Sequence, residues 1–369
     1  MIPRRSLLQA LALAGAMPLR VRATDGEAVR RGRMLQFPRD HGAHLGAAIE
    51  WWYVTGDLRT ADARRFGFQI TFFRSRTGLA DTLDSRFAPR HLLFAHAALS
   101  DLKAQQHLHA QRVARWSGDE SALLARASLR DTDLRLGGWS LVRHDADGRS
   151  LYDSSFELGQ GIRIELQMRA TQPVLLQGDA GFSRKGPDEA QASHYLSEPQ
   201  LAVGGRLQRA GQTLAVQGRA WLDHEWSDRL LHPDAVGWDW IGMNLDDGAA
   251  LTAFRLRRAD GSSLWAGGSF RSAAGRLQVF DADAVRFTPG RLWTSPASGA
   301  SYPLQWTVDT PAGRFELRAL LDAQELDSRA STGTVYWEGL SDLFDAQQRH
   351  IGSGYLEMTG YAGRLRMGA

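Results

Sequence analysis

Apolar and polar residues alternate in short stretches along most of the chain, and this pattern predicts strands joined by tight turns. Residues 64–74, for example, place Phe66, Phe68, Ile70 and Phe72 on one face, with the period of two that a strand shows. Comparable runs occupy residues 49–58, 91–100, 133–143, 155–158, 162–169, 201–209, 212–221, 238–245, 250–258, 263–271, 302–310, 313–321, 334–339 and 350–360. Only residues 119–127 are compatible with one short helix.

Turn residues between these runs indicate how neighbouring strands pair. Asp247-Gly248 and Asp260-Gly261 each separate two alternating runs, which is a strong short-range hairpin signal. Regular short strands joined by turns are typical of sandwiches or barrels, so we expect an all-β protein. Since the chain is too long for one eight-stranded barrel, we expect two domains, residues 24–230 and 231–369. The boundary between them depends on Pro233 and on the loss of alternation near it.

The first residues resemble an export signal rather than part of the fold. Arg4-Arg5 precedes an apolar run from Leu7 to Leu19, and Val21-Arg22-Ala23 offers small residues for cleavage near Ala23. We therefore interpret residues 1–23 as a twin-arginine-type signal and expect a periplasmic protein. The apolar run is too short to span a bilayer, which argues against stable membrane insertion.

Composition excludes several classes of function. Removing the leader leaves 40 basic and 41 acidic side chains, so nothing points to nucleic acid. The chain has no cysteine, which rules out disulfides, thiolate catalysis and cysteine metal ligands. His44, His96 and His194 do not have the spacing of a metal motif, and Gly204-Gly205 and Gly267-Gly268 do not open a helix as phosphate loops do. We expect neither a metal nor a cofactor.

The densest chemistry lies in residues 221–227 and 237–242. In an extended strand Leu222, His224 and Trp226 share one face, and Asp223 and Glu225 share the other. Further along, Trp238 and Trp240 share a face, while Asp239 lies on the side of Ile241 and Met243. An acid buried among apolar neighbours has a raised pKa and can hold a proton near neutral pH, which makes Asp239 a candidate proton donor.

The order of motifs resembles the superfamily of AttH and carotenoid 1,2-hydratase (hydroxyneurosporene synthase). The first motif is His44, which five residues separate from Glu50-Trp51-Trp52-Tyr53. The others are Thr55-Gly56, Phe72-Phe73-Arg74, residues 91–101, residues 221–226 and Gly237-Trp238-Asp239-Trp240. The resemblance covers nearly all of the chain after the leader and implies two lipocalin-like antiparallel β-barrels in tandem. The group contains hydratases that act on isoprenoid double bonds and exported proteins, some of which are associated with ABC transport systems.

Two functions are therefore open. In the first, the protein binds a hydrophobic, lipid- or isoprenoid-like molecule, with ABC transporter components as possible partners. In the second, it is a hydro-lyase that adds water to an isoprenoid double bond by acid catalysis. His224 and Trp226 match the His-x-Trp element of the hydratase branch, and Asp239 is the nearest candidate for its acid. Other candidate ligand-binding residues are Glu50, Trp52, Tyr53, His96, Trp221, Trp238 and Trp240.

Each candidate also has a structural interpretation. Trp51, Trp52 and Tyr53 can seal a barrel end, and His224 can be a core histidine with satisfied hydrogen bonds. Asp223 and Glu225 fit orienting or strand-pairing roles better than catalysis. Asp239 can form a buried ion pair with an arginine.

Overall fold

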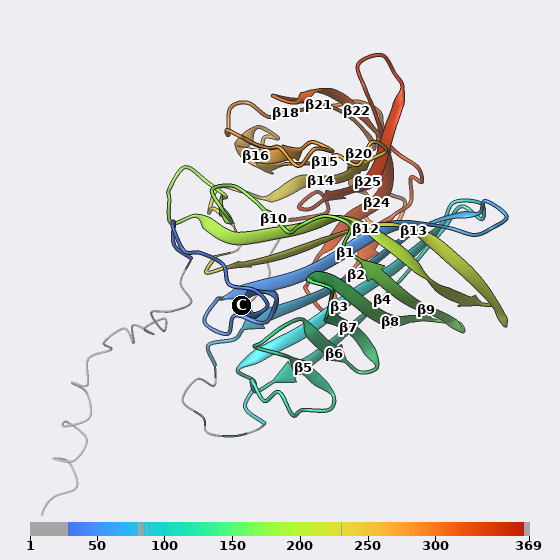
Figure 1. The fold of residues 1–369 in the computed structure, drawn as a ribbon. Helices are drawn as coiled ribbons and strands as arrows, with labels where there is room; N and C mark the ends of the chain where they lie inside the picture. Colours follow the sequence, from blue (N-terminus) through green and yellow to red (C-terminus); the bar gives the residue numbers. More distant parts are fainter. Residues whose placement is uncertain (1–28, 80–82, 84, 86, 230, 365–369) are drawn as a thin grey trace, which may run out of the picture.

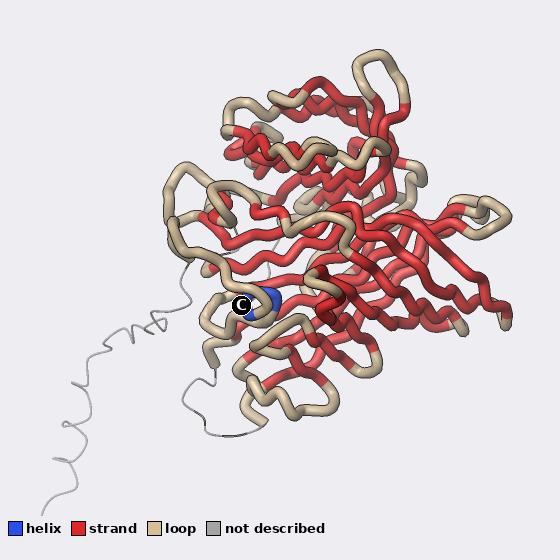
Figure 2. The backbone as a smooth tube through the Cα atoms, viewed as in Figure 1, coloured by secondary structure: helices blue, strands red, loops and turns tan. Residues whose placement is uncertain are grey.

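The computed structural model describes residues 29–79, 83, 85, 87–229 and 231–364, and strands make up most of them (Figure 2). The predicted leader, residues 1–23, lies outside the described residues. The one helical segment among the described residues is a 3₁₀ turn, η1 (Arg39–His41), so no helix there has the length or the hydropathy to cross a membrane.

The first large sheet is antiparallel and contains strands from the first two thirds of the chain. Its strands are β1 (Ile49–Arg59), β2 (Arg65–Arg76), β3 (His91–Asp101), β4 (Gln106–Trp116), β5 (Ala125–Ala127), β6 (Asp133–Leu136), β7 (Trp139–Ala146), β8 (Arg149–Gly159), β9 (Ile162–Arg169), β10 (Leu175–Leu176), β11 (Phe182–Arg184), β12 (Ala192–Arg209) and β13 (Gln212–Ser227). The order runs β4-β3-β2-β1-β13-β12-β9-β8-β7-β6-β5, with β10 and β11 paired to β12. The end strands β4 and β5 lie close together, so the sheet is a nearly closed barrel.

A second antiparallel sheet follows and is stacked on the first (Figure 1). Its strands are β14 (Gly237–Leu245), β15 (Ala250–Arg257), β16 (Ser263–Arg271), β17 (Leu277–Phe280), β18 (Arg286–Pro289), β21 (Gln305–Thr310), β22 (Gly313–Ala319), β23 (Glu325–Asp327), β24 (Val335–Phe344) and β25 (His350–Met358), and β19 (Leu292–Thr294) pairs separately with β20 (Ser301–Pro303). The order is β17-β16-β15-β14-β25-β24-β22-β21-β18, with β23 paired to β24.

Each sheet encloses its own apolar core, as expected for two lipocalin-like barrels. In the first barrel Phe66, Phe68 and Ile70 pack inside the sheet, so the alternation predicted for residues 64–74 is confirmed. In the second barrel Ile241 and Met243 pack against a separate cluster. The all-β prediction is therefore confirmed. The change of sheet falls between β13 and β14, and the exact domain boundary near residues 230 and 231 stays a prediction.

The local predictions are right for most hairpins and wrong at two places. Residues 119–127 do not form a helix, because they contain a turn, bends and strand β5. Strand β4 was not expected, since most of its side chains on both faces are partly exposed and its sequence shows no clear alternation. Both errors fall near the ends of the first sheet, where burial imposes the weakest pattern.

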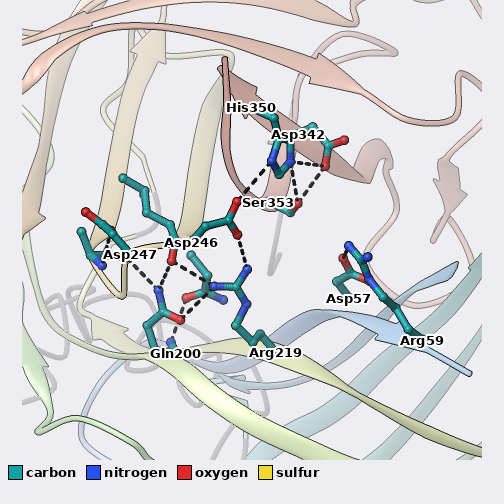
Figure 3. Close-up of polar contacts among 12 residues, drawn as sticks. Asp57, Arg59, Gln200, Arg219, Asp246, Asp247, Asp342, His350 and Ser353 are labelled. Carbon is teal, nitrogen blue, oxygen red and sulfur yellow. Dashed lines mark hydrogen bonds and ion pairs between the residues drawn. The ribbon is translucent and has the colours of Figure 1, made fainter. Parts of the chain in front are cut away.

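Polar contacts join the two barrels at their seam (Figure 3). Arg219 of β13 donates to Asp246 at 2.6 Å, and Asp246 also pairs with His350 of β25 at 3.2 Å. The other ring nitrogen of His350 lies 3.4 Å from Asp342. Gln200 adds hydrogen bonds from its side chain to the backbone oxygens of residues 245 and 249 at 2.9 and 2.7 Å. The two barrels therefore meet through specific contacts as well as apolar packing.

We expect the close approach of the paired strands β13 and β1 to require a glycine. A Cβ atom added to Gly218 would lie 1.8 Å from the backbone oxygen of Asp57, whereas one added to Gly204 would meet nothing within 4 Å. Because backbone atoms cannot move aside cheaply, Gly218→Ala should lower the Tm by about 2–10 °C, and Gly204→Ala should leave it nearly unchanged. Differential scanning calorimetry of the two variants measures this, and equal Tm values would contradict the close approach.

Candidate functional site

Strand β13 presents different chemistry on its two faces, as its alternation predicts. Leu222 and His224 point into the first barrel, where Leu222 packs in the core and His224 stacks on Trp52 with ring centroids 4.5 Å apart. Asp223 and Glu225 point the other way and line a cleft between the two barrels. The histidine and the acids of this motif thus belong to two separate environments.

The inner face carries a closed hydrogen-bond network around Glu50. One oxygen of Glu50 is 2.7 Å from Nδ1 of His44 and 2.9 Å from Nε2 of His224, and its second oxygen accepts from Nε of Arg74 at 2.9 Å. These side chains are at most 1% exposed. Although burial favours a neutral Glu50, the charges of His44 and Arg74 hold its pKa well below the usual range. Burial lowers the pKa of His224, which opposes a charged imidazolium there.

The same network is the one group of potential metal ligands in the described chain. Ligand atoms of His44, Glu50 and His224 all lie within 4.8 Å of one another. Both histidines already make short contacts to a single carboxylate oxygen, and the Arg74 guanidinium adjoins the other oxygen. A divalent cation would have to displace these contacts and sit close to a positive charge. The donor set thus fits hydrogen bonding better than metal ligation, and the expectation of no metal stays a prediction.

Asp239 lies inside the second barrel rather than in the cleft. Its carboxylate accepts from Nε of Arg255 at 2.7 Å and from the Tyr361 hydroxyl at 2.9 Å, and Nε of Arg257 is 3.2 Å away. Asp239 is fully buried. The buried ion pair that the sequence left open as an alternative is therefore what the structure contains.

The face of the first barrel that carries Asp223 meets the second barrel at what we call the interbarrel cleft. The space between its walls, counted together with the open solvent at its mouth, is about 830 Å³. Eight of its 19 lining residues are aromatic, and these rings are Trp51, Tyr53, Phe73, Tyr195, Trp238, Trp240, Phe254 and Tyr336. Four carboxyl groups also reach it, those of Asp223, Glu225, Glu338 and Glu357. A concave apolar site with a few convergent polar groups is the usual form of a small-molecule site.

Asp223 is the best-defined acid in this cleft. Its oxygens accept hydrogen bonds from the Tyr195 hydroxyl at 2.7 Å, from Ser197 Oγ at 2.5 Å and from Trp221 Nε1 at 2.6 Å. Tyr195 in turn accepts from Nε1 of Trp240 at 3.2 Å. Burial raises the pKa of Asp223 to about 7, even though these donors stabilise the carboxylate. A carboxyl group with this pKa carries a proton in a large share of molecules at neutral pH.

Two further acids come from the opposite wall, formed by the second barrel. Glu338 and Glu357 are cross-strand partners on β24 and β25. Burial, together with the charge of Glu357, raises the pKa of Glu338 well above its usual range. Burial also raises the pKa of Glu357 to about 7, opposed by the indole N–H of Trp238 and reinforced by the charges of Asp223 and Glu225. Acids therefore reach the cleft from both barrels.

Glu225 differs from the other three acids because a cation accompanies it. Nζ of Lys185 lies 3.0 Å from its Oε1. The same ammonium stands over the rings of Tyr195 and Phe254, 4.7 and 4.3 Å from their centroids. Aromatic faces attract cations, so Lys185 is held at the cleft wall beside its carboxylate partner.

The predicted site residues divide into three groups. The first group belongs to the cleft: Tyr53, Trp238 and Trp240 line it, and Trp221 donates a hydrogen bond to Asp223 there. His96 lies behind the cleft wall, where its two ring nitrogens are each 2.8 Å from a hydroxyl, those of Tyr336 and Ser331. The inner network and its surroundings hold Glu50, Trp52, His224 and Trp226, the last stacked on His44 with centroids 3.7 Å apart. Asp239 stands alone in the second barrel.

Sequence reasoning gave too little weight to Asp223 and Glu225, and it missed Lys185, Tyr195, Glu338 and Glu357. Glu338 and Tyr336 alternate with Trp337 in β24, and only Trp337 belongs to the barrel core. An acid that follows three apolar residues at the start of a strand was a usable signal. The cleft residues of the first barrel that face it, Tyr53 and Asp223, however, lie more than a hundred residues away in the chain.

The position of Asp239 leads to a stability prediction. Asp239→Asn removes a buried negative charge and leaves two nearby arginines without their partner, so it should lower the free energy of unfolding by about 3–5 kcal/mol. Urea denaturation of the variant measures this loss. The control is Asp309→Asn, since Asp309 forms a longer, more exposed pair with Arg314 at 3.6 Å and its loss should cost less than about 1 kcal/mol. Equal losses would contradict a structural role for Asp239.

Comparisons with known proteins agree with this fold. The model of the AttH-like family matches residues 28–361. The crystal structure of a protein from Nitrosomonas europaea described as an AttH is 45% identical, with a TM-score of 0.82 over 90% of this chain and 99% of that one. None of the curated proteins compared with the chain matches it.

Two more distant structures are similar in fold alone. Kievitone hydratase from Nectria haematococca is 16% identical, with a TM-score of 0.66 over 92% of this chain and 95% of that one. CghA with Sch210972 is 10% identical, with a TM-score of 0.54 over 92% of this chain and 97% of that one. The match of the family model over most of the chain, and the 45% identity over its length, lead to one conclusion: the protein belongs to the AttH-like family.

Proposed function

We propose that the protein is a hydro-lyase that adds water to a carbon–carbon double bond of an apolar, isoprenoid-like molecule held in the interbarrel cleft. The observation that carries this proposal is Asp223, a buried acid with a pKa of about 7 that opens onto an aromatic wall. Proton donation to an unactivated alkene requires such an acid near the double bond, with water largely excluded.

In the proposed reaction the Asp223 carboxyl gives its proton to one alkene carbon. A C–H bond forms from the π electrons, the O–H bond of the acid breaks, and the second carbon becomes a carbocation. The electron-rich faces of nearby rings such as Trp240 and Phe254 can stabilise that charge. A water molecule then forms the C–O bond, and Glu225 accepts the proton that the water loses. Transfer of that proton to Asp223 through solvent restores the starting state, with an alcohol as the product.

The positions of the two acids on one strand support this division of roles. Asp223 and Glu225 are two residues apart on the same face of β13, which sets their Cα atoms about 7 Å apart. That distance leaves room for a water molecule between Glu225 and a substrate carbon that Asp223 protonates. Lys185 pairs with Glu225 at 3.0 Å and holds the proposed base at the cleft wall.

The fold similarity to kievitone hydratase is compatible with this chemistry but does not establish it. As a second candidate we propose a protein that only binds the apolar ligand, with ABC transporter components as partners, which the aromatic lining of the cleft favours. For either function we propose export to the periplasm, on the basis of residues 1–23. The binding proposal needs no proton transfer, so acid variants separate the two.

Hydration can be tested with two apolar alkenes, 2-isopropenylnaphthalene and geranylacetone. Wild-type protein in H₂¹⁸O should convert at least one of them to an alcohol that carries the heavy oxygen, detected by mass spectrometry. Asp223→Asn cannot donate the proton and should lower kcat/KM by about 100-fold or more.

Asp153→Asn is the matched control, since Asp153 is half exposed on the first barrel and should retain full activity. Both probes should still quench the tryptophan fluorescence of Asp223→Asn, because the rings of the cleft are intact. Binding of both alkenes by wild-type protein without any ¹⁸O incorporation would contradict the enzyme proposal and support the binding one.

The pKa of Asp223 also fixes a pH dependence. Burial raises its pKa from 3.8 to about 7, so the proton-bearing form is lost as the pH rises through 7. We expect kcat/KM to fall about tenfold per pH unit above that point. Stability follows the same sign, because the folded state binds this proton more tightly than the unfolded state does. The stability of wild-type protein relative to Asp223→Asn should fall between pH 4 and pH 7, by up to about 4 kcal/mol. A difference that is constant over this range, measured by urea denaturation, would contradict the assignment.

A further inference from the structure

Several buried oxygen atoms in the interbarrel cleft make no hydrogen bond within the described part of the chain. They are the Tyr53 hydroxyl, both carboxyl oxygens of Glu338, Oε1 of Gln69, and Oε1 of Glu225, which the Lys185 ammonium accompanies. The first two groups belong to side chains that can donate a proton. Tyr53 is 6% exposed and Glu338 is 1% exposed. Both residues line the cleft, Tyr53 from β1 of the first barrel and Glu338 from β24 of the second. The two groups are near each other, and a contact between them contributes to the pKa of each, but the contact falls short of hydrogen-bond geometry.

The surroundings of Tyr53 and Glu338 combine aromatic rings with polar side chains, most of which are already hydrogen-bonded. Tyr53 meets the ring of Trp240 edge-on, with centroids 5.3 Å apart. The neighbouring Tyr336 hydroxyl is taken up by His96 at 2.8 Å and by Gln69 at 3.3 Å. A buried polar group without a partner destabilises a fold, and native proteins contain few of them. A ligand atom that accepts hydrogen bonds and enters the cleft would accept from the Tyr53 hydroxyl and the Glu338 carboxyl at once.

We propose that Tyr53 and Glu338 form an oxygen-binding subsite in the interbarrel cleft, and that the ligand is an apolar molecule that carries a carbonyl oxygen. The inference rests on the proposed function, because it concerns the same cleft, and it names the class of molecule bound there. A carbonyl oxygen has two lone pairs and no proton of its own, so it can accept from the phenol and the carboxylic acid together.

The protonation of both groups supports this role. Burial, followed by the charge of Glu338, raises the pKa of Tyr53 well above its usual range. Burial and the charge of Glu357 also raise the pKa of Glu338 well above its usual range, which favours the protonated form that can donate. A neutral carboxylic acid beside a tyrosine, in an apolar site, is a known means of binding a carbonyl oxygen in enzymes.

A matched pair of ligands tests the subsite without any turnover. The ketone 2-acetylnaphthalene and the hydrocarbon 2-isopropylnaphthalene have nearly the same shape, and neither has an alkene side chain to hydrate. Isothermal titration calorimetry gives the ratio of their Kd values. In Tyr53→Phe and in Glu338→Met the Kd of the ketone, divided by the Kd of the hydrocarbon, should be about tenfold higher than in wild-type protein. The Kd of the hydrocarbon should stay within about twofold of the wild-type value.

Glu338→Gln is the matched control, because its amide still donates and should retain most of the preference for the ketone. Glu338→Met should also keep or raise the Tm, since it removes a buried group that has no partner, so loss of fold does not account for a changed ratio. The proposal is overturned if the ratio changes less than twofold in both Tyr53→Phe and Glu338→Met. That result would mean that the two side chains do not bind the ketone oxygen and contact only water. It is overturned equally if wild-type protein does not bind the ketone. This experiment measures only equilibrium binding. The proposal of hydration can therefore be wrong while the oxygen-binding subsite is confirmed, and the subsite can be wrong while hydration is confirmed.

Discussion

Burial of carboxyl groups against aromatic rings, at the seam of two barrels, is the constraint on which the candidate site depends. In water Asp223 or Glu357 would be ionised at neutral pH, but each has a pKa of about 7 here because the rings and the opposing barrel keep water away. Neither barrel alone could create this environment. Tyr53 and Trp221 of the first barrel pack with Trp240 and Tyr355 of the second in one shared apolar cluster. The acidity of the site is thus a property of the assembled pair.

The inner network of the first barrel holds the strand that carries the key acid. Glu50 on β1 binds His224 on β13, and the two strands are adjacent and in register, with Trp52 opposite His224 and Tyr53 opposite Asp223. Because His224 is fixed from inside, Asp223 on the outer face is fixed as well. This gives a physical reason for the mixed composition of residues 221–227. A barrel strand that is buried on both faces can hold structural ions on one side and reactive groups on the other.

Local pattern was enough to predict the class of fold and the direction of most side chains, since alternation reports which face is buried. It could not decide between Asp223 and Asp239, because both acids alternate with aromatic residues. One clue was available: the turn at Asp247-Gly248 sets the register that places Arg255 opposite Asp239, and this predicts an ion pair. No such clue links Asp223 to Glu338 or Glu357, which approach it only when the barrels dock. The cleft is a product of tertiary structure, and the sequence identified some of its aromatic residues but not the acids of the second barrel.

The two walls of the cleft differ in how fully their acids are paired. Three donors within the protein satisfy Asp223, so its proton can leave and return without a large change in local structure. Glu338, by contrast, makes no hydrogen bond of ordinary geometry in the described chain, and its burial favours the neutral acid because ionisation there is costly. A carboxyl group whose hydrogen-bond donors are already in place suits proton transfer, and a neutral carboxyl group without hydrogen bonds suits ligand binding. The difference in hydrogen bonding, rather than acidity alone, is why we propose proton transfer for Asp223 and ligand binding for Glu338.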